Sequence, residues 1–240
     1  MTAERTDIDD LRAARERVLG RIADACARAG RDPADVTLVA VSKTVDVERV
    51  RIAIEAGLTT LGENRVQEGE AKAAALPDAT WHLVGPLQSN KAKRALEAFD
   101  VIETVDSVEL AGRLDRLAAE VRPGTAVPVL LQVNVDADPA KAGFAPDDLA
   151  RVAADLDGLT NLDVRGLMTV GRLVERSEDA RSTFIALREL SARLRSSWSR
   201  LGPELSMGMT DDFEVAIEEG ATTVRVGRAL FGDRPGPASD

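Results

Sequence analysis

A lysine ends a short apolar run near the N-terminus of the chain. Lys43 directly follows LVAVS, whereas the other four lysines occur in helical or loop contexts. A lysine at the end of a buried strand is costly unless neutralised or paired, because burial disfavours the ammonium form and lowers its pKa. A lowered pKa is what a Schiff-base amine needs. We therefore predict a Schiff-base role for Lys43; the structural alternatives are exposure at a strand end or pairing with Glu63.

Two segments near the C-terminus, ELSMGMTDDF and TTVRVGRALFG, have the chemistry of an anion site. Hydroxyl groups bind phosphate oxygens, glycines allow close backbone approach, and the amide at the start of a helix points toward an anion. The residues that supply these groups are Ser206, Thr210, Gly208, Gly227 and Arg228. The alternative for Thr210 is a helix N-cap, since Asp211 and Asp212 follow it.

A strand-end lysine together with a phosphate site suggests a cofactor that carries both an aldehyde and a phosphate, and pyridoxal phosphate fits that description. Arg225, in VRVG, is also consistent with pyridoxal phosphate. An arginine that faces the pyridine nitrogen keeps the nitrogen unprotonated, because two adjacent positive charges repel. Carbanion chemistry on the ring is then restrained. The alternative is an outward-facing arginine paired with Glu218 or Glu219.

Three residues from the middle of the chain fall at or inside predicted strands. Asn64 in GENRVQE, His82 in WHLVGPLQSNK and Met168 in GLMTV are candidates to line a flat aromatic ring. For His82, a hydrogen-bonded core position is the alternative. No metal site is expected, because one histidine and one cysteine cannot form a His/Cys cluster.

Short segments rich in Val, Ile, Leu and Thr alternate with amphipathic stretches along most of the chain, which is typical of parallel βα units. Eight strands are predicted, at residues 37–42, 59–62, 81–85, 101–105, 127–134, 162–168, 204–207 and 222–226. Helices are predicted in every gap between these strands, for example at residues 47–56, 65–75, 107–120, 146–156, 178–197 and 211–219, after a leading helix that carries Cys26 on its apolar stripe. The count favours a (β/α)8 TIM barrel, whose strands direct polar residues to one mouth. A doubly wound open sheet is the rival, but VAVSKTVD lacks the glycines of its phosphate loop.

The composition of the chain excludes some classes of binding partner. The 240 residues include 31 Lys+Arg and 41 Asp+Glu, a net charge of -10 that argues against nucleic acid. The mixed charges of the first residues fit no export signal, and no apolar run is long enough to span a membrane. We expect a cytoplasmic protein with one domain over residues 1–234 and a frayed tail at 235–240.

The strings LVAVSKT, GENRVQE, WHLVGPLQSNK, LLQVNV, GLMTV, LSMGMTDDFEVAIEEGAT and VRVGRALFG resemble, in order, the motifs of the pyridoxal phosphate homeostasis proteins. The resemblance implies a single barrel similar to the N-terminal domain of bacterial alanine racemases. It implies that Lys43 forms the Schiff base and that Arg225 faces the pyridine nitrogen. It also implies that Gly227 and Arg228 donate backbone N–H groups to the phosphate, beside Ser206 and Thr210. The family usually has serine where this chain has Thr210, so the hydroxyl is kept.

Two classes of function follow from this resemblance. One is a non-catalytic carrier or regulator of pyridoxal 5'-phosphate, with apoenzymes that use the cofactor as possible partners. The other is an amino-acid racemase or a related enzyme. Racemisation needs a base on each face of the substrate, and alanine racemases use a tyrosine opposite the lysine; this chain has no tyrosine. We therefore predict a carrier, and a monomer because the racemase β-domain is lacking. A Schiff-base aldolase barrel is a third possibility, but such barrels carry the lysine on a later strand.

Overall fold

The computed structural model describes residues 2–172 and 174–232, and these form a closed barrel of eight parallel strands in the order β1 to β8. The strands are β1 (Thr37–Val41), β2 (Thr60–Glu63), β3 (Thr80–Leu83), β4 (Val101–Val105), β5 (Val127–Gln132), β6 (Leu162–Met168), β7 (Glu204–Met209) and β8 (Thr223–Val226). All eight predicted strands are confirmed, each to within two residues. Strand β8 pairs with β1, so the open-sheet alternative is wrong.

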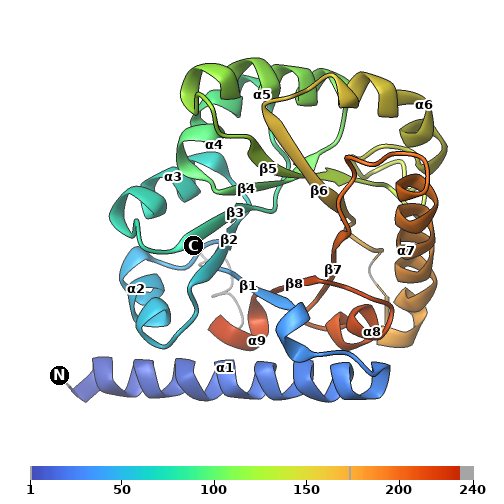
Figure 1. The fold of residues 1–240 in the computed structure, drawn as a ribbon. Coiled ribbons are helices and arrows are strands. Elements are labelled where there is room, and N and C mark those ends of the chain that lie inside the picture. The colour runs from blue at the N-terminus through green and yellow to red at the C-terminus, as the bar shows by residue number, and fades with distance from the viewer. Residues whose placement is uncertain (1, 173, 233–240) are drawn as a thin grey trace.

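Helices surround the barrel (Figure 1). They are α1 (Thr2–Ala29), α2 (Val47–Glu55), α3 (Val66–Ala75), α4 (Ala92–Ala98), α5 (Val108–Val121), α6 (Pro146–Asp157), α7 (Arg181–Arg195), α8 (Phe213–Glu218) and α9 (Arg228–Phe231). Short 3-10 helices lie at Pro33–Asp35, Ser89–Lys91 and Ser177–Ala180. The last of these stands where the helix predicted at 178–197 was expected to begin, and α7 starts directly after it. Helix α4 fills the gap between β3 and β4, where the sequence predicts a helix without giving its bounds. The predicted tail at 235–240 lies outside the described residues.

Helix α1 is the addition to the eight βα units. It lies across one side of the barrel and packs against α2, α8 and α9 (Figure 1). Its stripe from Leu11 to Cys26 is buried as predicted, and burial raises the pKa of the Cys26 thiol, which suits a structural role. No helix of the described residues has the length and apolarity that crossing a membrane requires.

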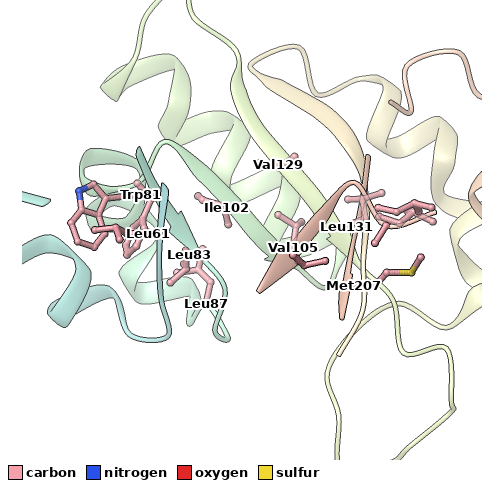
Figure 2. Close-up of a cluster of buried hydrophobic side chains, with 14 of the residues drawn as sticks. Leu61, Trp81, Leu83, Leu87, Ile102, Val105, Val129, Leu131 and Met207 are labelled. Carbon is pink, nitrogen blue, oxygen red and sulfur yellow. The ribbon is translucent and has the colours of Figure 1, made fainter. Parts of the chain in front are cut away.

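Side chains alternate along each strand between the barrel interior and the layer under the helices. On β3, Trp81 and Leu83 belong to a buried cluster that includes Leu61 and Ile102 (Figure 2). The Trp81 indole donates a hydrogen bond to the Leu76 carbonyl at the end of α3, at 3.2 Å. The helices are therefore held to the barrel by large apolar side chains.

Trp81→Ala tests this layer. We expect a loss of about 3–5 kcal/mol in the free energy of unfolding, because the substitution leaves a cavity between β3 and α3. Urea denaturation measures the loss. Met209→Ala is the control: Met209 is 38% exposed, so its replacement should cost less than about 0.5 kcal/mol. Equal effects in the two variants would contradict the packing described here.

Candidate functional site at the barrel mouth

The loops after β1 and β8 form the first part of the site. Lys43 lies two residues beyond β1, Gly227 directly follows β8, and Arg228 begins α9. These three residues line one cavity of about 200 Å³, with Asp46 and Phe231 among its other walls. A Cβ atom on Gly227 would lie 3.3 Å from the Val41 carbonyl oxygen, so glycine allows the two loops to approach closely. The structure thus brings a half-buried lysine beside a glycine-rich helix start.

Thr210 joins this set through its hydroxyl. The Gly227 N–H donates to Thr210 Oγ1 at 3.4 Å. The N-cap alternative for Thr210 is wrong, because α8 begins later, with Asp212 as its N-cap residue. The Asp212 carboxylate instead accepts a hydrogen bond from the Met209 N–H at 2.6 Å. The connection from β7 to α8 therefore turns back toward the end of β8, and the Thr210 hydroxyl lies beside Gly227.

Gly208 allows this turn. Its φ is +91°, and an added Cβ would lie 2.6 Å from the Ala216 Cβ. Both the left-handed backbone and the space therefore require glycine. The Arg228 side chain pairs with Asp211 at the surface, while its backbone amide lies in the first turn of α9, where N–H groups have no acceptor within the helix.

Arg225 points into the barrel. Its Nη1 donates to Ser206 Oγ at 2.5 Å and its Nη2 donates to the Thr169 carbonyl at 2.7 Å. Burial lowers the pKa of Arg225, although the nearby Glu103 and Asp212 act in the opposite direction. The guanidinium thus lies among the ends of β6, β7 and β8.

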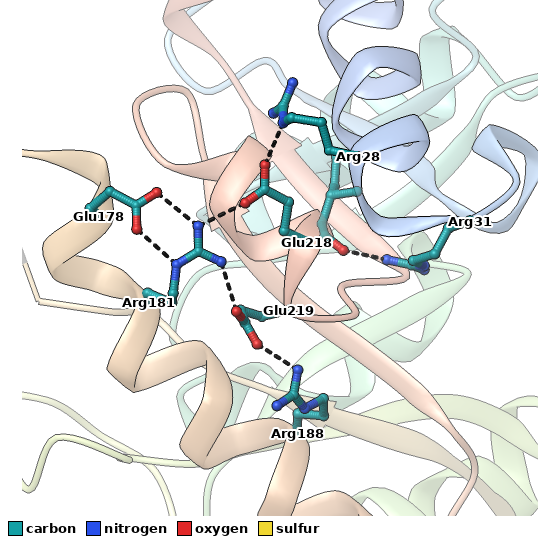
Figure 3. A network of polar contacts seen from close by, with 8 residues as sticks. Arg28, Arg31, Glu178, Arg181, Arg188, Glu218 and Glu219 are labelled. Carbon is teal, nitrogen blue, oxygen red and sulfur yellow. Dashed lines mark hydrogen bonds and ion pairs between the residues drawn. The ribbon is translucent and has the colours of Figure 1, made fainter.

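The surface alternative for Arg225 is wrong. Glu218 and Glu219 both accept hydrogen bonds from Arg181, at 2.7 Å (Figure 3). Arg28 and Arg188 also pair with these two carboxylates, on the outer side of the barrel wall. The two glutamates therefore tie α8 to α1 and α7 and leave Arg225 to the interior.

Ser206 and Met168 are neighbours in the β6–β7 ladder, and both are fully buried. Ser206 Oγ donates to Glu103 Oε2 at 2.6 Å and accepts the bond from Arg225. Both hydrogen bonds of the Ser206 hydroxyl thus go to side chains of the barrel interior, and its contact with a phosphate stays a prediction. Met168 ends β6 close to Thr169, whose carbonyl contacts Arg225.

Asn64 and His82 line two cavities other than the one that Lys43, Gly227 and Arg228 share. Asn64 follows β2 and lines a neighbouring cavity of about 680 Å³ with Pro86 and Lys91. His82 lines a cavity of about 340 Å³ together with the first residues of several strands, such as Thr60 and Thr80. That cavity is at the amino ends of the strands, opposite the mouth. His82 therefore borders a different cavity from the one that Lys43 lines, and its contact with a cofactor ring stays a prediction.

Sequence reasoning missed a buried network behind Lys43. Lys72 Nζ donates to Glu63 Oε1 at 2.7 Å, to the Ser42 carbonyl at 2.8 Å and to Glu68 Oε1 at 2.9 Å. Glu63, which the sequence offered as an alternative partner for Lys43, pairs with Lys72 and accepts a hydrogen bond from Ser42 Oγ at 2.7 Å. Burial raises the pKa of Glu63, against the effects of Lys72 and Ser42. The spacing of Glu68 and Lys72 on one helix face was the available sequence signal.

The same network holds the backbone next to Lys43. The Thr44 N–H donates to Glu68 Oε1 at 2.7 Å. Thr44 has a φ of +68°, which is unusual for a β-branched residue. Glu68, which is held by Lys72, therefore stabilises a strained turn directly after Lys43.

Comparison with known proteins agrees with this geometry. The alanine racemase N-terminal domain model matches residues 19–235. The pyridoxal phosphate homeostasis protein of Pseudomonas aeruginosa is 45% identical over 223 residues, which cover 91% of this chain and 93% of that protein. The chain belongs to the pyridoxal phosphate homeostasis protein family. The Escherichia coli K12 member is 38% identical over 90% of this chain and 94% of its own.

Solved structures extend the comparison. PipY of Synechococcus elongatus, solved with PLP bound, is 44% identical, with a TM-score of 0.77 over 88% of this chain and all of its own. Alanine racemase of Clostridium difficile has a TM-score of 0.73 at 16% identity, over 95% of this chain and 58% of the racemase. The second likeness establishes a shared barrel fold.

Proposed function

We propose that this chain binds pyridoxal 5'-phosphate at the barrel mouth, with Lys43 as the amine that forms a Schiff base. The observation that carries the proposal is the cavity shared by Lys43, Gly227 and Arg228. In the reaction the Lys43 nitrogen adds to the aldehyde carbon, a C=N bond forms and water leaves. The names of the relatives and the PLP-bound PipY structure support the same cofactor.

The donor set fits this cofactor. The Thr210 hydroxyl and the backbone N–H groups of Gly227 and Arg228 would hold the phosphate. Arg225 would face the pyridine nitrogen, and Met168 and Asn64 would border the ring. When bound, the cofactor supplies an electrophilic carbon and an electron-withdrawing ring. Arg225 limits the second property, because its positive charge disfavours protonation of the ring nitrogen.

We further propose a carrier or regulator in cytoplasmic cofactor supply rather than an enzyme, acting as a monomer with apoenzymes as candidate recipients. The family name supports a role in homeostasis. The sequence has no tyrosine to act as a second base. His82 lines the cavity at the amino ends of the strands, and Cys26 is buried on α1. Neither residue is available opposite Lys43.

Borohydride reduction tests the proposal directly. Protein mixed with pyridoxal phosphate should gain an absorption band near the visible edge, which reduction removes while fixing one cofactor on the peptide that contains Lys43. No band and no uptake of the cofactor would refute the binding. Steady turnover of L-alanine or L-serine that requires Lys43 would instead favour the racemase alternative.

Thr210→Val tests the phosphate contact. We expect pyridoxal phosphate to bind about 10- to 150-fold more weakly, because a hydrogen bond to a charged group contributes about 1.5–3 kcal/mol. Binding of pyridoxal, which lacks the phosphate, should not change. Thr80→Val, at the opposite cavity, is the matched control. A uniform loss for both ligands would contradict a phosphate role.

A further inference from the structure

Four polar side chains from four strands form a continuous chain of hydrogen bonds across the barrel interior. His82 Nδ1 lies 2.6 Å from Glu103 Oε1, and Glu103 Oε2 accepts from Ser206 Oγ at 2.6 Å. Ser206 Oγ accepts in turn from Arg225 Nη1 at 2.5 Å. One end of this chain borders the amino-end cavity and the other lies under the mouth.

The donor and acceptor roles in this chain follow from chemistry. An ionised carboxylate only accepts and a guanidinium only donates, so the single Ser206 proton goes to Glu103 and its lone pairs face Arg225. His82 must then carry its proton on Nδ1 to donate to Glu103. Glu103 thereby decides the orientation of Ser206, and Ser206 decides where Arg225 donates.

The charge of Glu103 is also needed. Its side chain has no exposed surface, and a carboxylate buried to this degree is costly unless it is paired. Burial raises the pKa of Glu103, but hydrogen bonds and charges from His82, Arg225 and Ser206 outweigh burial and leave the pKa below its usual range. Glu103 therefore stays ionised, with its Oε2 3.9 Å from Arg225 Nη1.

Other charged groups face the two ends of the chain. Asp212, beyond β7, acts on Arg225 from the mouth. Glu204 on β7 and Arg165 on β6 lie with His82 around the amino-end cavity. Burial raises the pKa of Glu204, so this carboxylate is less firmly ionised than Glu103. Glu103 is thus the carboxylate that is linked to Arg225 by hydrogen bonds.

Building on the proposed function, we propose that Glu103 is a positioning residue for the cofactor: through Ser206 it orients Arg225 and sets the net charge at the ring-nitrogen end of the site. No direct contact between Glu103 and the ring is required. Without the Glu103 carboxylate, less of the positive charge of Arg225 is offset. Protonation of the bound cofactor would then be disfavoured, because like charges repel.

Glu103→Gln tests the proposal, because it keeps the size of the side chain and removes the charge. The absorption band of the loaded protein is titrated with pH, and thermal unfolding is followed without cofactor. We expect the midpoint of the band's titration to fall by about one pH unit. Glu204→Gln, a carboxylate on β7 that lies at the amino end, should leave the midpoint unchanged. Wild-type protein with a band but an unchanged midpoint in Glu103→Gln would overturn the inference; wild-type protein without a band would refute the proposed function itself.

Ser206→Ala tests whether Glu103 acts on Arg225 through Ser206 if Glu103→Gln does not fold. If Ser206 acts by holding Arg225, this variant shifts the midpoint and weakens the binding of pyridoxal and of pyridoxal phosphate by similar factors. If Ser206 acts on the phosphate, only pyridoxal phosphate binds more weakly and the midpoint stays, which would overturn the inference.

Discussion

Lys43→Ala should abolish the absorption band of the loaded protein and the borohydride-stable adduct. The amine of Lys43 is the group that lines the mouth cavity with Gly227 and Arg228, so no other lysine should replace it. We expect affinity for pyridoxal phosphate to fall about 100-fold, equivalent to about 2.7 kcal/mol of binding free energy. Residual binding comes from the phosphate contacts. Absorbance and mass spectrometry after reduction measure the two effects.

The fold should survive this substitution. Lys43 is half-buried after the end of β1, and we expect the free energy of unfolding to change by less than about 1 kcal/mol. Lys93→Ala is the matched control, because Lys93 is an exposed lysine on α4. A band that persists in Lys43→Ala and disappears in another lysine variant would move the Schiff base to that lysine.

The barrel could be predicted from the sequence because its signal is local. Alternating β-branched runs and amphipathic stretches recur eight times, and each run became a strand. Helix α4 was expected only from its place between two strands, because seven residues carry too little periodicity to give its bounds. Lys43, Gly227 and Arg228 could be predicted for a related reason: each lies within two residues of the end of a predicted strand, and parallel strands in a barrel end at one mouth.

The side-chain partners could not be predicted, because they depend on which strands meet across the barrel. Glu103 and Ser206 are about a hundred positions apart in sequence, yet they share a short hydrogen bond. The level of His82 within the barrel depends on strand register, which sequence pattern does not fix. The N-cap reading of Thr210 failed through a shift of two residues, a common uncertainty at helix ends.

Lys72 is a residue whose buried partners the sequence did not reveal, and its replacement should have a large effect on stability. Lys72→Met removes the cation that pairs with Glu63 and Glu68 and that binds the Ser42 carbonyl. Glu63 is fully buried, so the variant leaves a carboxylate without its partner. We expect a loss of about 3–5 kcal/mol in the free energy of unfolding, measured by urea denaturation.

The pH dependence of this loss distinguishes a buried charge from lost packing. The pKa of Glu63 is already raised by burial, and without Lys72 it rises further. A carboxyl whose folded-state pKa is raised destabilises the fold above its unfolded pKa, and the penalty disappears as the pH falls below that value. The difference between Lys72→Met and wild type should therefore shrink toward pH 4. A difference that is independent of pH would indicate packing instead.

Glu63→Gln in the Lys72→Met background completes the test. Two neutral side chains remove the unpaired carboxylate, so the double variant should be more stable than Lys72→Met alone at neutral pH. The double variant should still load pyridoxal phosphate less well than wild type, because Glu68 has lost the partner that holds it against the Thr44 N–H. The strained turn at Thr44, directly after Lys43, is then less firmly held. Full recovery of stability with unimpaired loading of pyridoxal phosphate would show that the network of Lys72, Glu63 and Glu68 does not affect the cofactor site.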